Sequence, residues 1–177
     1  MSRLPQRLRQ LQLLVLDVDG VLTDGGLSYS PDGQIWRRFD VRDGLGLKFL
    51  QQAGLTLALM SGGRSGAIER RAADLGITFC FSEVTNKQLQ LQSLQQELAV
   101  RPEVTGFVGD DLNDLVVRPQ VGLLVAPADA CQPVRRQADL VLRCGGGQGA
   151  VRELAERILQ ARGEWADLAQ RGWRHRN

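Results

Sequence analysis

Short apolar runs alternate along this chain with longer segments in which apolar residues recur at helical spacing. The runs read as buried strands and occupy residues 13–18, 55–60, 77–81, 104–108, 121–125 and 140–142. The helical segments occupy residues 45–52, 65–75, 87–98 and 151–161, and two shorter helices are expected after Asp111 and Ala130. This alternation predicts a doubly wound, Rossmann-like α/β fold, in which helices cover both faces of a parallel central sheet. Binding sites in such folds form at the carboxyl ends of the strands.

Residues 25–40 interrupt the alternation. Two short extended stretches flank the turn sequence Ser30-Pro31-Asp32-Gly33, so we expect a β-hairpin inserted after the first strand. The length of 177 residues suits a single core, and we expect one domain over residues 1–162. Residues 163–177 are expected to form a C-terminal tail, and the sequence leaves open whether this tail is flexible or folds back.

Charge and residue usage exclude several classes of protein. The formal net charge is +2 and no basic stripe is interleaved with aromatic residues, so neither nucleic acid nor a membrane surface is an expected partner. The apolar run at 13–16 is too short for a signal peptide or a membrane span, which makes the cytoplasm the expected location. The single histidine, His175, lies in the tail, so carboxylates rather than a Ser-His-Asp triad are expected to carry any chemistry.

Two carboxylates stand one residue apart where the first strand ends, in Asp17-Val18-Asp19-Gly20. In a continuing strand both side chains would point to one face, and two buried acids would need a compensating charge. A divalent cation that prefers hard oxygen ligands, such as Mg²⁺, would supply that charge. The alternative is that the pair caps the next element, and the motif alone does not decide between the two.

Three further polar features fall at the ends of later strands or at the start of a helix. Ser61 opens the sequence Ser61-Gly62-Gly63-Arg64, where a hydroxyl and backbone amides could hold phosphate oxygens. Lys87 begins a predicted helix, a place where an ordinary surface lysine would also fit. Gly109-Asp110-Asp111-Leu112-Asn113-Asp114 adds acids after another strand, and Asp111 is also a candidate helix cap. The common position of these features at one sheet edge predicts a single site.

The order of these motifs resembles the haloacid dehalogenase (HAD) superfamily, whose pattern is Asp-x-Asp-Gly-Val/Leu-Thr, Ser/Thr-Gly, Lys and Gly-Asp-Asp-x-x-Asp. Within it, the chain resembles the branch of 3-deoxy-D-manno-octulosonate 8-phosphate phosphatases. The stretches that carry the branch resemblance are 17–25, 39–46, 71–77, 109–114, 125–130 and 146–153. The resemblance implies a phosphoric monoester hydrolase of lipopolysaccharide biosynthesis that acts on a small phosphorylated sugar acid.

The resemblance also implies a role for each matching residue. Asp17 would attack phosphorus and form a phospho-aspartyl intermediate, and Asp19 would serve as general acid and then general base. Mg²⁺ would be held by Asp17, Asp110 and the backbone carbonyl of Asp19. The remaining implied roles are phosphoryl binding by Ser61 and Lys87, orientation of the metal site by Asp111 and Asp114, and substrate contact by Arg42, Gly62 and Arg64.

The inserts are too short for the cap domain that covers the site in many members of the superfamily, so the resemblance implies a capless enzyme. The related proteins form a homotetramer in which hairpins pair between subunits and a neighbour's glycine-rich segment reaches the site. Residues 25–40 match the hairpin, and Gly145-Gly146-Gly147-Gln148-Gly149 matches the segment, although a plain flexible loop explains these glycines equally well. An exposed hairpin edge is itself a reason to expect an oligomer.

One position departs from the branch. Gly63 stands where the octulosonate phosphate phosphatases usually have arginine, and Arg64 follows one place later. This departure favours, as an alternative, a phosphatase for another sugar phosphate, and we expect Gly63→Arg to improve the handling of carboxylated substrates. The alternatives from other classes are a phospho-accepting receiver and a non-catalytic binding subunit. The order of the acidic motifs fits a receiver poorly, and the complete set of site residues argues against a non-catalytic role.

Overall fold

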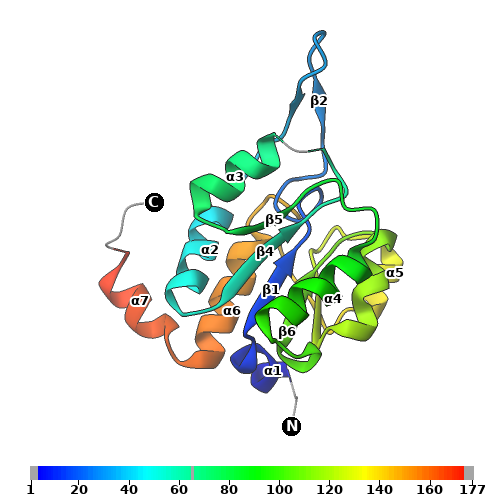
Figure 1. The fold of residues 1–177 in the computed structure, drawn as a ribbon. Helices are drawn as coiled ribbons and strands as arrows, with labels where there is room; N and C mark the ends of the chain where they lie inside the picture. The colour runs from blue at the N-terminus through cyan, green and yellow to red at the C-terminus, as the bar shows by residue number, and fades with distance from the viewer. Residues whose placement is uncertain (1–3, 65, 174–177) are drawn as a thin grey trace.

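The computed structural model describes residues 4–64 and 66–173, so residues 1–3, Ser65 and residues 174–177, with His175, lie outside the described part of the chain. Six strands form one sheet in the order β5-β4-β1-β6-β7-β8, and every pairing in it is parallel. The strands are β1 (Leu13–Leu16), β4 (Thr56–Met60), β5 (Phe79–Phe81), β6 (Thr105–Val108), β7 (Leu123–Ala126) and β8 (Leu140–Val141). The order and the parallel pairing confirm the expected doubly wound fold (Figure 1).

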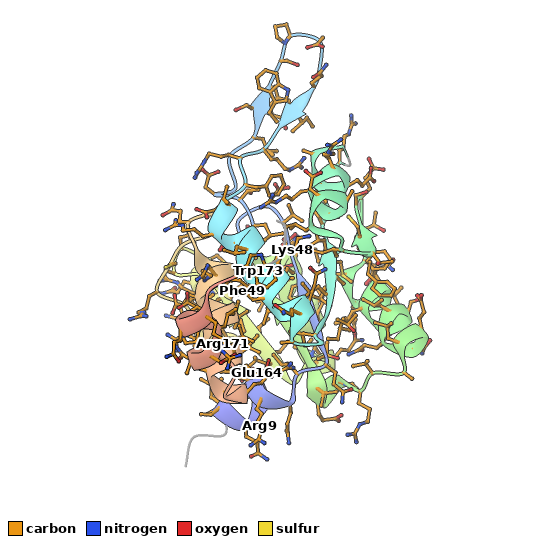
Figure 2. The ribbon with its side chains drawn as sticks, turned by 90° about the vertical axis from the view of Figure 1, so that its left-hand side faces the viewer. Arg9, Lys48, Phe49, Glu164, Arg171 and Trp173 are labelled. Atoms are coloured by element: carbon orange, nitrogen blue, oxygen red, sulfur yellow. The ribbon has the colours of Figure 1, made fainter. Side chains whose placement is uncertain are left out.

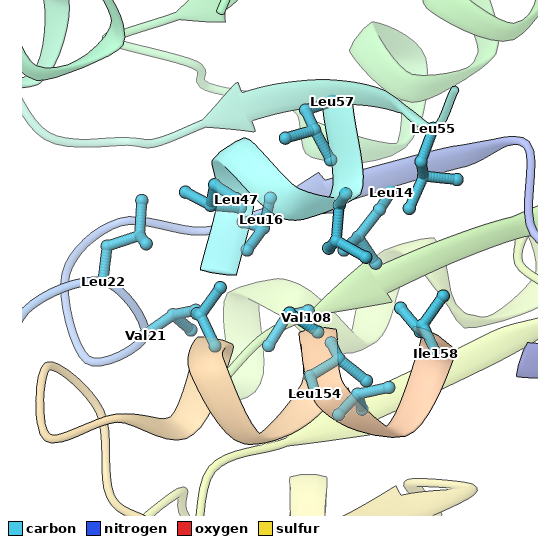
Figure 3. Packing of buried hydrophobic residues seen from close by; sticks show 14 of the residues in the cluster. Leu14, Leu16, Val21, Leu22, Leu47, Leu55, Leu57, Val108, Leu154 and Ile158 are labelled. Carbon is cyan, nitrogen blue, oxygen red and sulfur yellow. The ribbon is translucent and has the colours of Figure 1, made fainter. Parts of the chain in front are cut away.

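Helices cover both faces of the sheet because the central strands are apolar on both sides. On β1, Leu14 and Leu16 pack into one cluster, whereas Leu13 and Val15 pack into another. Figure 3 shows the first cluster, where Leu154 of a covering helix meets the strands. The helices on this face are α2 (Val41–Gln52), α3 (Ala67–Leu75) and α6 (Ala150–Arg162), and those on the other are α4 (Lys87–Leu98) and the 3₁₀ helix η2 (Leu112–Gln120).

The order of strand addition reverses at β1, which lies between β4 and β6. Leu16 pairs with Leu59 of β4 and with Val108 of β6, so the three strands end side by side. The chain therefore brings the residues after β1, β4 and β6 to one edge of the sheet. A reversal of this kind opens a crevice at the carboxyl ends of the strands, where doubly wound folds bind their ligands.

A two-stranded hairpin projects from this same end of the molecule (Figure 1). Its strands β2 (Ser28–Tyr29) and β3 (Ile35–Trp36) pair antiparallel, with Ser28 opposite Trp36. The side chains of Tyr29 and Trp36 are left largely in solvent, at 68% and 62% exposure. The hairpin thus presents aromatic surface beyond the body of the domain.

Two terminal helices form outside the segments that the sequence pattern marked as helical. The first is α1 (Leu4–Gln10), which packs against α6 and buries Leu8. The second is α7 (Trp165–Arg171); beyond it, Trp173 meets Phe49 edge-on with ring centroids 5.0 Å apart (Figure 2). The remaining short elements are η1 (Pro102–Val104) and α5 (Gln132–Gln137). Among the described helices, none combines the length and the hydropathy that crossing a bilayer requires.

Candidate active site

Asp17, Lys87 and Asp114 form a buried ion-pair cluster at the reversal point of the sheet. The Nζ atom of Lys87 lies 2.8 Å from Oδ2 of Asp17 and 2.6 Å from Oδ1 of Asp114. The three side chains are 3%, 8% and 0% exposed, in the order Lys87, Asp17 and Asp114. Asn86 caps α4 by accepting a hydrogen bond from the Leu89 amide, so the helix starts at Lys87. One ammonium group therefore faces two carboxylates away from water.

Asp110, which follows β6, brings a third carboxylate to this cluster. One carboxylate oxygen from each of Asp17, Asp110 and Asp114 can be chosen so that all three lie within 4.8 Å of one another. Gly20 makes this approach of the β1 and β6 loops possible: its φ is +82°, and a Cβ at this position would overlap the carboxylate of Asp110. Both the positive φ at position 20 and the close approach of Asp110 therefore require a glycine there.

The electrostatics of the cluster favour an added cation. Burial, followed by the charge of Asp114, raises the pKa of Asp17 to about 6 against the opposing effect of Lys87. Burial, followed by the charges of Asp114 and Asp17, raises the pKa of Asp110 to about 7. Burial acts to lower the pKa of Lys87, but the charges of Asp17 and Asp114 outweigh it and leave that pKa above its ordinary value. Three acids against one lysine leave the site short of positive charge.

Asp114 is suited to orient its neighbours because both of its oxygens already have partners. Oδ1 pairs with Lys87, and Oδ2 accepts a hydrogen bond of 2.9 Å from the backbone amide of Asp110. Asp111 is the N-cap of η2 and forms a reciprocal capping box with Asp114, so the expected capping role of Asp111 is confirmed. The carboxylates of Asp17 and Asp110 form a hard oxygen donor set that fits Mg²⁺.

Ser61 lies at the end of β4 and is 1% exposed. Its Oγ accepts a hydrogen bond of 3.0 Å from the amide of Gly63, which leaves the hydroxyl proton to donate to a bound group. Gly62 and Arg64 are exposed on the same loop. The loop therefore presents one buried hydroxyl beside the carboxylates and a polar rim above them.

Asp19 has a partner that the sequence did not indicate. Nε and Nη2 of Arg37 donate to Oδ1 and Oδ2 of Asp19 at 2.8 and 3.1 Å, a two-point ion pair between the hairpin and the β1 loop. Nη1 of Arg37 donates to the carbonyl of Arg64 at 3.3 Å. In the sequence, Arg37 and Arg38 directly follow the second hairpin strand, and nothing in this pair of arginines indicates the contact.

Arg42 and the glycine-rich segment meet at the base of the hairpin. Nη2 of Arg42 donates to the carbonyl of Gln148 at 3.1 Å, and the guanidinium also pairs with Asp40. The amide of Gly147 donates to the carbonyl of Val21 at 3.0 Å. The segment that the resemblance assigned to a neighbour's site thus packs here against the β1 loop of its own chain.

The structure gathers most of the expected site residues and leaves others at its edge. Asp17, Lys87, Asp110 and Asp114 lie in one buried cluster, and Ser61 ends the adjacent strand. Asp19 is partly exposed above them. The residues at the rim, with exposed or partly exposed positions, are Arg42, Gly62, Arg64 and Asp111.

The fold and the site together define a class of protein. A capless doubly wound sheet carries a buried aspartate and lysine at its reversal point, with a second aspartate two residues on and an acidic loop after β6. This is the arrangement of a hydrolase of the HAD superfamily.

Comparisons with known proteins give the family within that class. No protein-family model matches the chain. It is 42% identical over 159 residues to the 3-deoxy-D-manno-octulosonate 8-phosphate phosphatase KdsC of Haemophilus influenzae, covering 90% of this chain and 88% of the relative. The KdsC protein of Escherichia coli is 41% identical over 154 residues, covering 87% and 82%. The crystal structure of the Moraxella catarrhalis phosphatase in complex with magnesium, phosphate and KDO superimposes with a TM-score of 0.92 at 34% identity, covering 97% and 99%. The chain belongs to the family of 3-deoxy-D-manno-octulosonate 8-phosphate phosphatases, which are phosphoric monoester hydrolases.

Proposed function

We propose that this chain hydrolyses the phosphate ester of 3-deoxy-D-manno-octulosonate 8-phosphate, with Mg²⁺ as its cofactor. The observation that carries the proposal is the buried set of Asp17, Lys87 and Asp110 at the reversal point of the sheet, where a nucleophile, a cation and a metal ligand come together. The similarity to relatives that act on this sugar acid supports the choice of substrate.

In the first step, a carboxylate oxygen of Asp17 attacks phosphorus and the bond to the sugar oxygen breaks. Asp19 donates a proton to the leaving sugar oxygen, so the sugar departs as an alcohol and Asp17 carries the phosphoryl group. Lys87 and the Ser61 hydroxyl bind phosphoryl oxygens and hold the group in line with Asp17. The burial of Asp17 and Lys87 keeps water away from the nucleophile.

In the second step, a water molecule attacks the phosphorus atom of phospho-aspartyl 17. Asp19, now ionised, takes a proton from that water, and cleavage of the phosphorus–oxygen bond releases inorganic phosphate and regenerates Asp17. Bound Mg²⁺ would be held by Asp17, Asp110 and the carbonyl of Asp19, and it would offset the negative charge that gathers as two anions meet. Asp111 and Asp114 would keep the Asp110 loop in place through the capping box.

The proposal extends to assembly as a homotetramer. The hairpin presents Tyr29 and Trp36 to solvent next to the open site, and such a surface is suited to pairing with a second copy. The cytoplasm is the proposed location.

Phosphate release from a panel of phosphate monoesters tests the function. We expect octulosonate 8-phosphate to be preferred over hexose phosphates and nucleotides, and EDTA to stop the reaction. Asp17→Asn should abolish turnover, and Asp19→Asn should bind Mg²⁺ while losing about 10²–10⁴-fold in rate. Asp32→Asn, in the exposed hairpin turn, is the matched control and should keep full activity. Turnover of wild-type size in Asp17→Asn would refute the mechanism, and a preference for other phosphates would keep the chemistry and change the substrate.

A further inference from the structure

Arg37 is the hairpin residue that reaches into the site. Its side chain is 1% exposed, although it extends from a projecting hairpin. The guanidinium uses Nε and Nη2 on Asp19 and Nη1 on the carbonyl of Arg64. A guanidinium has five N–H donors, so with respect to the described residues two remain for an acceptor that enters the site.

Gly63 provides the space that this guanidinium occupies. A Cβ at position 63 would lie 2.6 Å from Nη2 of Arg37 and 2.8 Å from Oδ2 of Asp19, both too close for a carbon contact. A side chain at position 63 would therefore require the guanidinium of Arg37 and the carboxylate of Asp19 to shift from their observed positions. This geometry changes the expectation for Gly63→Arg, since an arginine there would disturb the contact between Arg37 and Asp19.

The position of Arg37 relative to the two ends of a substrate indicates which end it meets. In the proposed function, the phosphoryl group lies with Asp17, Ser61 and Lys87, and the leaving oxygen lies at Asp19. Arg37 contacts Asp19 from the hairpin side, so a substrate whose leaving oxygen meets Asp19 would have its organic part next to the Arg37 guanidinium. A planar guanidinium with a fixed set of donors is suited to a carboxylate.

We propose that Arg37, in the space left by Gly63, is the specificity-determining residue that binds the carboxylate of the sugar acid while positioning Asp19. This inference rests on the proposed function, because it presupposes a carboxylated phosphate monoester as substrate. Arg37 thereby links the hairpin to the choice of substrate.

The test compares octulosonate 8-phosphate with glucose 6-phosphate, which lacks a carboxylate, in Arg37→Gln and Arg37→Lys. In both variants kcat/KM should fall for both substrates, because Arg37 no longer positions Asp19. The fall in kcat/KM should be about tenfold or more larger for the sugar acid than for glucose 6-phosphate, because only the sugar acid loses a charge-assisted hydrogen bond to its carboxylate. The additional fall should appear as a higher KM. Arg37→Lys keeps the positive charge but lacks the paired donors of a guanidinium. Its ratio of kcat/KM for the sugar acid to kcat/KM for glucose 6-phosphate should lie between those of the wild type and Arg37→Gln. The matched control is Arg38→Gln, whose exposed side chain pairs with Asp24 at 3.3 Å and whose loss should leave the ratio unchanged.

Gly63→Arg adds a second, independent readout. Alone, it should lower kcat/KM for the sugar acid, since its Cβ would push the Arg37 guanidinium and the Asp19 carboxylate out of their observed positions. Combined with Arg37→Gln, it should restore part of the preference for the sugar acid, because one guanidinium then fills the space.

The outcomes separate the two levels of the proposal. A substrate ratio in Arg37→Gln equal to that of the wild type, or a double variant with the same ratio as Arg37→Gln, would overturn the role of Arg37 while leaving the proposed function intact. A wild-type enzyme without preference for carboxylated phosphates would overturn both.

Discussion

The ammonium group of Lys87 lies 2.8 Å from Oδ2 of Asp17, and neither side chain is more than 8% exposed. A buried ion pair contributes little net stability when it is intact, yet removing one partner leaves an uncompensated buried charge. The lysine therefore matters for the ionisation of Asp17, the proposed nucleophile, and for the stability of the metal-free protein.

Lys87→Met should remove both effects of the lysine, the one on the ionisation of Asp17 and the one on the stability of the metal-free protein. We expect the metal-free variant to lose about 3–5 kcal/mol of unfolding free energy, since Asp17 and Asp114 remain buried without a cation. Added Mg²⁺ should restore part of that loss by binding the carboxylates. Phosphate release should fall about 10²-fold or more because a phosphoryl-binding charge is gone. Urea unfolding with and without Mg²⁺ measures the first effect, with Lys48→Met on α2 as the control. Equal losses with and without Mg²⁺ would contradict this electrostatic account.

The raised pKa values of Asp17 and Asp110 predict a pH dependence with a definite sign. Both carboxyl groups have folded-state pKa values, about 6 and about 7, above the ordinary 3.8, so the folded protein holds more protons than the unfolded chain between pH 4 and 7. Their contribution to the stability of the metal-free protein is therefore present below pH 4 and is lost as the pH rises towards 7.

The measurement is the difference between wild type and Asp110→Asn in unfolding free energy, followed in EDTA from pH 4 to 7. Asparagine does not titrate, so the wild type should lose stability relative to the variant as the pH rises. Mg²⁺ binding should show the opposite trend and tighten over the same range, because the metal needs ionised ligands. A constant difference across the range would show that Asp110 titrates normally.

The edge of the sheet that carries the proposed active site was predictable from the sequence because it depends on local patterns. Asp17, Ser61 and Asp110 each follow an apolar strand, and parallel strands end at one edge. The contact of Arg37 with Asp19 was not predictable, since it depends on how the hairpin folds back over the site. Helix α1 was also missed: its sequence is mostly polar, and the burial of Leu8 against α6 stabilises it.

Asp43 caps a helix that lies far along the chain. Its carboxylate, 1% exposed on α2, accepts hydrogen bonds from the amides of Gly149 at 3.3 Å and Arg152 at 2.8 Å, at the start of α6. Asp43→Ala should lower the unfolding free energy by about 1–3 kcal/mol, because one buried and one partly buried amide lose their acceptor. Asp74→Ala, which breaks an exposed pair with Arg70, is the control and should change it by less than about 0.5 kcal/mol. Chemical denaturation of both variants measures the difference, and equal values would remove Asp43 from this role.

Trp36 should decide whether copies of this chain associate through the hairpin. Its ring and that of Tyr29 lie in water at 62% and 68% exposure, on strands of two residues that project from the domain. Burying such rings against a second copy is favourable, and each aromatic ring can contribute about 150–250 Å² of buried surface. Trp36→Ser should therefore shift the mass measured by light scattering from that of the proposed tetramer towards smaller species, without lowering the melting temperature of the monomeric domain. Leu112→Ser removes an equally exposed apolar side chain on η2, at 58%, and should leave the mass unchanged. If both variants keep the wild-type mass, the hairpin is not the surface through which the subunits assemble.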